Sequence, residues 1–301
     1  MAKTLDKKLV IGISSRALFD LRVENEIFEK EGYKKYSEYQ IQHEDEILKP
    51  GSGFSLVKAL LKLNEYPETK GRVEVVVMSR NSADTSLRVF KSIEHYGLDI
   101  TRGALTSGRH LSNYLNAFRT DLFLSAYSDD VQAAIDSGIA AGLIYTSSDV
   151  EYNVEDMDQI RIAFDGDAVL FSEESEMIFK KHGLDAFVEN ERKNAMKELP
   201  AGPFANFLKT ISSIQQQFDL DHCPIRTAIV TARSAPAHER VIRTLRAWNV
   251  RIDEAFFLGG IQKKDFLEAF GAHIFFDDQA THLLPASQSV PSAQVPYKSN
   301  Q

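Results

Sequence analysis

Residues 162–171 read IAFDGDAVLF and place two carboxylates, Asp165 and Asp167, two positions apart at the end of an apolar run. The apolar run predicts a buried strand, and Gly166 allows the backbone to turn tightly after it. Two like charges held together are costly unless a cation or a shared proton offsets their repulsion. Oxygen ligands of this kind suit Mg²⁺, although a polar turn after a strand is the simpler interpretation of the triplet alone.

Residues 225–234 contain a second apolar run, which ends in a hydroxyl group. Thr231 closes this run, and Ala232 and Arg233 follow it just before sequence typical of a helix. Backbone N–H groups at the start of a helix can bind phosphate, so we expect an anion site here. For the Arg233 side chain two roles stay open, contact with the phosphate and support of the loop.

A third apolar run, residues 273–279, ends in the paired carboxylates Asp277 and Asp278. Between the second and third runs, Lys263 and Lys264 supply ammonium groups just before a predicted helix. In a parallel sheet the ends of such strands meet at one edge. The sequence therefore predicts a site of carboxylates, a hydroxyl and a lysine at that edge.

The order Asp-x-Asp, Thr, Lys, Asp-Asp resembles the haloacid dehalogenase superfamily of phosphohydrolases. More closely, the chain resembles the cytosolic type I 5′-nucleotidases. Five segments carry this resemblance, namely residues 14–19, 163–172, 224–227, 230–234 and 274–279. Val169 stands where many members of the broad superfamily place Thr, but the nucleotidase resemblance does not require a hydroxyl there.

The resemblance implies a nucleophile, a metal and a proton carrier. Asp165 would attack phosphorus and form an aspartyl phosphate, while Asp167 would act as the general acid and base. Mg²⁺ would be held by Asp165, the backbone carbonyl of Asp167 and Asp277. Asp278 would be a further ligand or a neighbour that contacts the ligands.

The resemblance also implies how the substrate binds. Thr231 and the backbone N–H groups of Ala232 and Arg233 would bind the phosphoryl oxygens, and Lys263 would offset their developing charge, with Lys264 as the alternative lysine. The expected substrate is an AMP-like nucleoside 5′-monophosphate. This chemistry leaves no role for imidazole, so we expect His238, His273 and His282 to be structural or surface residues.

Two other functions stay open at this point. A phosphatase for another small phosphoester, or a phosphotransferase that passes the phosphoryl group to a nucleoside, would use the same residues. A nucleotide sensor without activity is the non-enzymatic alternative, and the intact set of carboxylates and lysine argues against it.

The chain also contains an internal repeat. Ser79 and Thr231 correspond at a spacing of 152 positions, and the spacing persists through the downstream helices and strands. Upstream, Ser14 and Asp165 correspond at a spacing of 151. A fixed spacing sustained over strands and helices indicates two related units.

The first copy lacks the carboxylates of the second. Ser14 stands in place of Asp165, and Arg16 in place of Asp167. Together with Ser79, these residues are a candidate second anion site that would not need a metal. The alternative is that the first copy is scaffold only.

The repeat and the alternation of strands with helices predict the fold class. We expect an α/β protein with a haloacid dehalogenase-like Rossmannoid sheet, mainly parallel, built from two tandem units with helical cap-like insertions. Residues 1–150 would form the degenerate unit. Residues 151–301 would form the catalytic unit, with its helical insertion at about 172–222.

Composition fits a cytoplasmic enzyme. The net charge of −8 in 301 residues argues against binding to polymeric nucleic acid, which needs a basic surface. The sequence has neither a run of apolar residues long enough to span a membrane nor a signal-peptide pattern after Met1. One cysteine, Cys223, excludes an intrachain disulfide. The oligomeric state, including a homo-oligomer, stays open.

Overall fold

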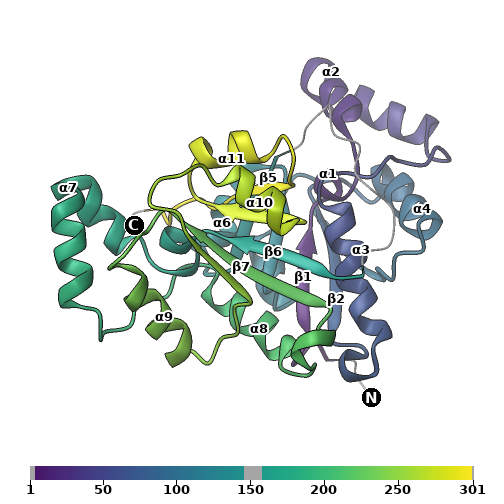
Figure 1. The fold of residues 1–301 in the computed structure, drawn as a ribbon. Helices are drawn as coiled ribbons and strands as arrows, with labels where there is room; N and C mark the ends of the chain where they lie inside the picture. Colours follow the sequence, from purple (N-terminus) through teal and green to yellow (C-terminus); the bar gives the residue numbers. More distant parts are fainter. Residues whose placement is uncertain (1–3, 146–157, 300–301) are drawn as a thin grey trace.

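The computed structural model describes residues 4–145 and 158–299, and the strands of these ranges form one ten-stranded sheet (Figure 1). The strand order is β3-β2-β1-β4-β5-β10-β9-β6-β7-β8. The strands are β1 (Leu9–Ile13), β2 (Val73–Ser79), β3 (Arg102–Leu105), β4 (Leu122–Ser125), β5 (Ala140–Ile144), β6 (Ile160–Phe164), β7 (Ile225–Thr231), β8 (Glu254–Phe257), β9 (Ile274–Asp277) and β10 (Ser292–Gln294).

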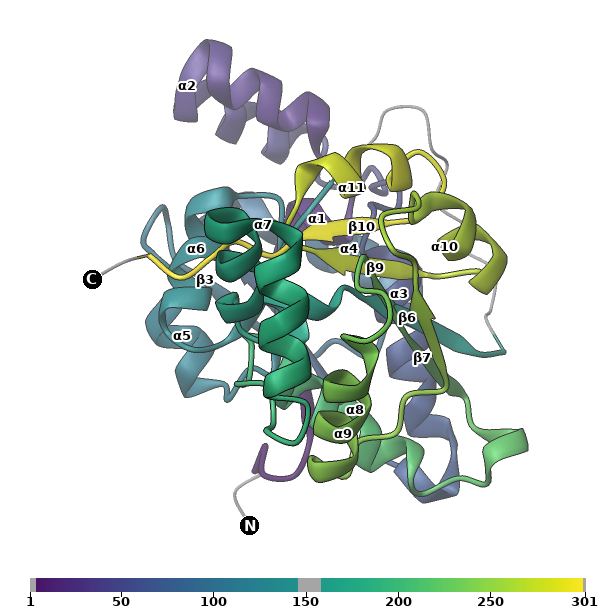
Figure 2. The same ribbon diagram turned by 60° about the vertical axis from the view of Figure 1, so that its left-hand side comes forward.

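Helices connect the strands and cover the sheet (Figures 1 and 2). In the first half they are α1 (Ser15–Leu18), α2 (Arg22–Gln42), α3 (Phe54–Lys62), α4 (Leu87–His95), α5 (Ser112–Ala117) and α6 (Ser128–Asp136). In the second half they are α7 (Glu174–Lys193), α8 (Ala205–Gln215), α9 (His238–Ala247), α10 (Lys264–Phe270) and α11 (Ala280–Ala286).

The two halves have the same strand order. Strands β1 to β5 run in the order 3-2-1-4-5, and β6 to β10 repeat it from the other end of the sheet. Pairing is parallel within each half, whereas β5 and β10 join the halves in an antiparallel pair. The expectation of a mainly parallel α/β sheet is confirmed. Because of the antiparallel junction, the carboxyl ends of the two sets of strands lie at opposite edges of the sheet.

Equivalent backbone hydrogen bonds support the repeat. The N–H of Ser14 donates to Leu124 O at 2.9 Å, and the N–H of Asp165 donates to Phe276 O at 2.8 Å. Ser14 and Asp165 therefore occupy equivalent strand ends. The predicted boundary near residue 150 lies outside the described residues, so the division into two domains stays a prediction.

The expected helical insertion at about 172–222 contains α7 and α8. Helices α2 and α7, one from each half, project from well-separated parts of the molecule (Figures 1 and 2). Both helices are interrupted at a glycine, Gly32 and Gly183, each with φ of +82°. Beneath them, apolar side chains from β1, β2, β6 and β7 form a core with α3 and α8 that crosses from one half to the other. The sheet thus supplies a rigid base for the loops at its two edges.

Candidate active site

The loop after β6 is built to hold Asp165 and Asp167 in place. Asp165 follows the last residue of β6, and the irregular turn Gly166–Leu170 contains Ala168 with φ of +60°. Gly202 closes this loop from the other side. A Cβ at Gly202 would lie 2.4 Å from the backbone O of Phe171, so only glycine permits the close approach.

Lys263 bridges two carboxylates in the centre of the site. Its Nζ lies 2.7 Å from Asp165 Oδ1 and 2.6 Å from Asp277 Oδ2. All three side chains are buried, so their charges are screened little by water. His282 Nδ1 lies 3.2 Å from the same oxygen of Asp277, so an imidazole borders the cluster, and the structural role expected for His282 stays a prediction.

Asp278 completes an acidic cluster with Asp165 and Asp277. One potential ligand oxygen from each carboxylate lies within 4.8 Å of the others. Tyr297 donates its hydroxyl hydrogen to Asp278 Oδ2, whereas Asp278 Oδ1 is buried without a hydrogen-bond partner among the described residues. A buried oxygen without a donor suits a cation. The cluster therefore fits a hard divalent ion such as Mg²⁺, whose preferred ligands are oxygens.

The buried charges of the cluster shift one another's pKa values. Burial raises the pKa of Asp165 well above its ordinary value, although the ammonium of Lys263 opposes this shift. Burial also raises the pKa of Asp278, to about 7, and the adjacent Asp277 adds to the effect. Burial lowers the pKa of Lys263, but the carboxylates of Asp165 and Asp277 outweigh it and raise the pKa overall. Three buried carboxyl groups thus share one lysine, and burial favours the neutral forms of Asp165 and Asp278.

Thr231 lies next to this cluster at the end of β7. A Cβ at Gly166 would lie 3.3 Å from Thr231 Oγ1, which brings the hydroxyl beside the Asp165 loop. The N–H of Arg233 donates to Thr231 Oγ1 at 3.3 Å, and Ala232 between them is exposed. The loop after β7 therefore presents a hydroxyl and backbone next to the carboxylates, as expected from the sequence.

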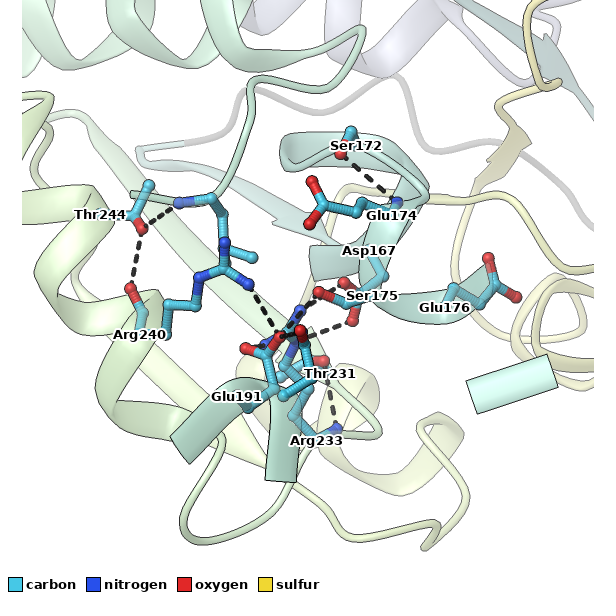
Figure 3. A network of polar contacts seen from close by, with 12 residues as sticks. Asp167, Ser172, Glu174, Ser175, Glu176, Glu191, Thr231, Arg233, Arg240 and Thr244 are labelled. Atoms are coloured by element: carbon cyan, nitrogen blue, oxygen red, sulfur yellow. Dashed lines mark hydrogen bonds and ion pairs between the residues drawn. The ribbon is translucent and has the colours of Figure 1, made fainter. Parts of the chain in front are cut away.

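The Arg233 side chain supports the loop. Its guanidinium donates to both carboxylate oxygens of Asp167, at 2.8 Å and 2.6 Å, and to Glu191 Oε2 at 2.6 Å (Figure 3). Arg233 is also buried, with its guanidinium 5.3 Å from the centre of the Phe187 ring. These contacts favour loop support over phosphate contact as the role of the Arg233 side chain. The Asp167 carboxylate lies outside the cluster of Asp165, Asp277 and Asp278.

Glu191 and Arg240 extend this network, although the sequence does not identify them as site residues. Glu191 on α7 accepts from Ser175 at 2.9 Å and from Arg240 at 2.9 Å, in addition to Arg233 (Figure 3). Tyr297, which contacts Asp278, is likewise not identified by the sequence. No local pattern identifies these residues, because their partners are distant in the chain.

The two lysines differ in their surroundings. Lys263 lies inside the cluster, whereas Lys264 is partly exposed, and its Nζ lies 3.9 Å from Glu268. Geometry therefore selects Lys263 as the candidate site residue.

The counterpart residues of the first half lie at the opposite edge of the sheet. Ser14 Oγ accepts from the N–H of Ala17 at 3.2 Å, and the hydroxyls of Ser79 and Ser15 lie 3.1 Å apart. The hydroxyls of Ser14 and Ser79 are thus engaged within the fold, while Arg16 lines a cavity.

The fold and the site define an α/β protein with a carboxylate cluster and a buried lysine at the carboxyl ends of parallel strands. The 5′-nucleotidase family model matches residues 1–301, and the chain belongs to this family. It is 42% identical over 286 residues to human cytosolic 5′-nucleotidase 1B, a match that covers 91% of the chain and 46% of that protein. The chain thus spans about half the length of this relative. No solved structure gives a significant match.

None of the helices in the described part of the chain combines the length and apolar character needed to cross a membrane.

Proposed function

We propose that the chain is a Mg²⁺-dependent 5′-nucleotidase that hydrolyses AMP-like nucleoside 5′-monophosphates to nucleoside and phosphate. The observation that carries this proposal is the meeting of Asp165, Asp277, Asp278 and Lys263 at the strand ends of a chain in the 5′-nucleotidase family. The relative is named as cytosolic, which supports a cytoplasmic location.

The proposed reaction has two displacements on phosphorus. In the first, a carboxylate oxygen of Asp165 forms a bond to phosphorus, the bond to the ribose 5′-oxygen breaks, and Asp167 gives that oxygen its proton. In the second, Asp167 takes a proton from water, and the water oxygen displaces Asp165 to release phosphate. Asp167 would have to leave its ion pair with Arg233, or exchange protons from within it, to act in this way.

Asp165, the backbone carbonyl of Asp167, Asp277 and Asp278 are the proposed metal ligands. When bound, Mg²⁺ would neutralise charge on the phosphoryl group and orient it. Thr231 and the N–H groups of Ala232 and Arg233 would bind phosphoryl oxygens. Lys263 would stabilise the charge that develops on them in the transition state.

A substrate panel tests this proposal against its rivals. Purified protein is incubated with nucleoside 5′-monophosphates and with other small phosphoesters, and free phosphate is measured with and without Mg²⁺. We expect Mg²⁺-dependent release that is fastest with a nucleoside 5′-monophosphate. Faster release from an unrelated phosphoester would instead indicate the more general phosphatase.

An acceptor nucleoside separates hydrolysis from phosphoryl transfer. Added nucleoside leaves phosphate release unchanged if water is the acceptor, and a phosphorylated nucleoside accumulates if the chain is a phosphotransferase. Binding without turnover of any phosphoester would support the nucleotide-sensor alternative and overturn the proposal.

A further inference from the structure

A cavity of about 630 Å³ lies over the carboxyl ends of the strands in the first half of the chain. The segments that follow β1, β2, β3 and β4 contribute to its lining, together with α2. Because Ser14 and Asp165 occupy equivalent strand ends, this cavity is the counterpart of the candidate active site. It faces the opposite edge of the sheet.

Arg16 supplies a positive charge to this cavity. Its guanidinium donates to Asn25 Oδ1 at 2.8 Å and lies 5.4 Å from the centre of the Tyr127 ring. Its Nε is buried and has no hydrogen-bond partner among the described residues. The structure records no ion pair between Arg16 and a carboxylate within residues 4–145 and 158–299. The scaffold interpretation requires a filled pocket and a neutralised Arg16, and neither is found.

Other charged groups of the lining are already paired. Arg80 Nε donates to the buried Asp130 at 2.9 Å, and the Glu24 carboxylate accepts from Arg88 at 2.6 Å. Arg16 is therefore the residue whose charge is available to an anion. An arginine can bind phosphate oxygens through two parallel hydrogen bonds.

Aromatic side chains surround the same cavity. Phe28 and Tyr33 are 48% and 55% exposed, and Tyr127 is 38% exposed. Phe28 and Tyr36 are in edge contact, with their ring centres 5.8 Å apart. Exposed aromatic side chains around a hollow are suited to contact a planar ring of a ligand.

Among its described residues, the first half has no counterpart of the metal cluster. Ser14 and Ser125 stand where Asp165 and Asp277 stand in the second half, and Leu111 replaces Lys263. Without an aspartate at the position of Asp165, the residues of this cavity can bind a phosphoester but not form an aspartyl phosphate.

We propose that this cavity is a second binding site, which takes a nucleoside phosphate without a metal. Arg16 binds the phosphate oxygens, and the aromatic side chains contact the base. The proposal concerns binding alone and does not depend on the activity proposed for the second half.

A fluorescent reporter placed in the cavity tests this proposal. Trp248 is the one tryptophan of the chain, and it packs against Phe171 in the second half. The Phe28→Trp variant therefore adds a tryptophan that reports on this cavity, with wild-type protein as the baseline. AMP, adenosine and inorganic phosphate are titrated separately in the presence of EDTA. We expect AMP to change the emission of Phe28→Trp saturably and at lower concentration than adenosine or phosphate.

The Arg16→Gln substitution in the Phe28→Trp background should raise the half-saturating AMP concentration about tenfold or more, since a charge-assisted hydrogen bond is lost. Arg119→Gln is the matched control, because Arg119 is exposed and does not line the cavity. Circular dichroism verifies that each variant is folded. The absence of any emission change with AMP, equal binding of adenosine and AMP, or unchanged AMP binding in Arg16→Gln would each overturn the proposal.

Discussion

The Arg233 guanidinium donates to both carboxylate oxygens of Asp167, at 2.8 Å and 2.6 Å. The same guanidinium donates to Glu191 Oε2 at 2.6 Å, and Arg240 donates to Glu191 Oε1 at 2.9 Å. Asp167, which lies in the active-site loop, is therefore linked to α7 by a network of two arginines and two carboxylates, of which Arg233, Arg240 and Glu191 are buried. The position of this proposed acid and base depends on a helix that contributes no carboxylate to the metal cluster.

The Glu191→Gln substitution should destabilise the protein strongly. It leaves the buried charges of Arg233 and Arg240 with one carboxylate fewer, and breaking a buried ion pair costs about 3–5 kcal/mol. Urea denaturation measures the free energy of unfolding. Glu239→Gln removes an exposed partner of Arg243 and serves as the control, with an expected loss of no more than about 1 kcal/mol. Equal losses in the two variants would contradict the importance of the network.

The stability deficit of Glu191→Gln should depend on pH. Burial works against ionisation of Glu191, but Arg233 and Arg240 outweigh it and lower its pKa below the ordinary value of 4.5. A carboxyl group with a lowered pKa contributes stability above its unfolded pKa and loses that contribution as pH falls through its folded pKa. The difference between wild type and Glu191→Gln should therefore be constant near neutrality and shrink below about pH 4. A difference that stays constant in acid would argue against this origin.

The Asp165→Asn substitution should abolish turnover and leave the fold intact. An amide of nearly the same shape is a far poorer nucleophile, so no aspartyl phosphate can form. Phosphate release and circular dichroism are measured together. Asp221→Asn, at an exposed position, is the control and should retain activity. Near-normal phosphate release by folded Asp165→Asn would remove Asp165 from the role of nucleophile.

Removal of the metal should stop phosphate release, and the Asp277→Asn substitution should raise the Mg²⁺ concentration needed to restore it. Asp277 contributes one of the three carboxylates that can reach a common ion. After EDTA treatment, Mg²⁺ is added back, and half-maximal activity is compared between variants. Asp185→Asn, exposed on α7, is the control. An unchanged Mg²⁺ requirement in Asp277→Asn would count against Asp277 as a ligand.

The sequence predicts the strand ends well because each apolar run ends next to a polar motif. Parallel pairing then brings Asp165, Thr231 and Asp277 to one edge without any knowledge of side-chain contacts. The antiparallel junction of β5 and β10 has no such signal, and it places the two sites at opposite edges.

Contacts between distant segments are also not readable from local patterns. Glu191 resembles any other charged residue of a surface helix until α7 folds against Arg233. Tyr297 and His282 reach the cluster only because the segments after β9 return over it. The sequence therefore predicts the residues expected to react better than those that hold them.

Substitution of adjacent lysines should separate the role of Lys263 from that of a surface charge. Lys263→Met removes the ammonium that bridges Asp165 and Asp277, so phosphate release at saturating Mg²⁺ should fall about 100-fold or more. Lys264→Met is the matched control. Because the Lys264 Nζ lies 3.9 Å from an exposed Glu268, its loss should change the rate little.

A structural role alone would predict a different pattern for Lys263→Met. Loss of the Lys263 ammonium from among the buried carboxylates should lower the stability of the metal-free protein. Added Mg²⁺ should recover part of that stability, because it supplies positive charge to the same oxygens. If Lys263 also acts in the transition state, phosphate release stays low even when Mg²⁺ has restored stability. Thermal denaturation and phosphate release are therefore measured over the same Mg²⁺ titration. Full recovery of both thermal stability and phosphate release would show that Lys263 serves only to neutralise the metal-free site.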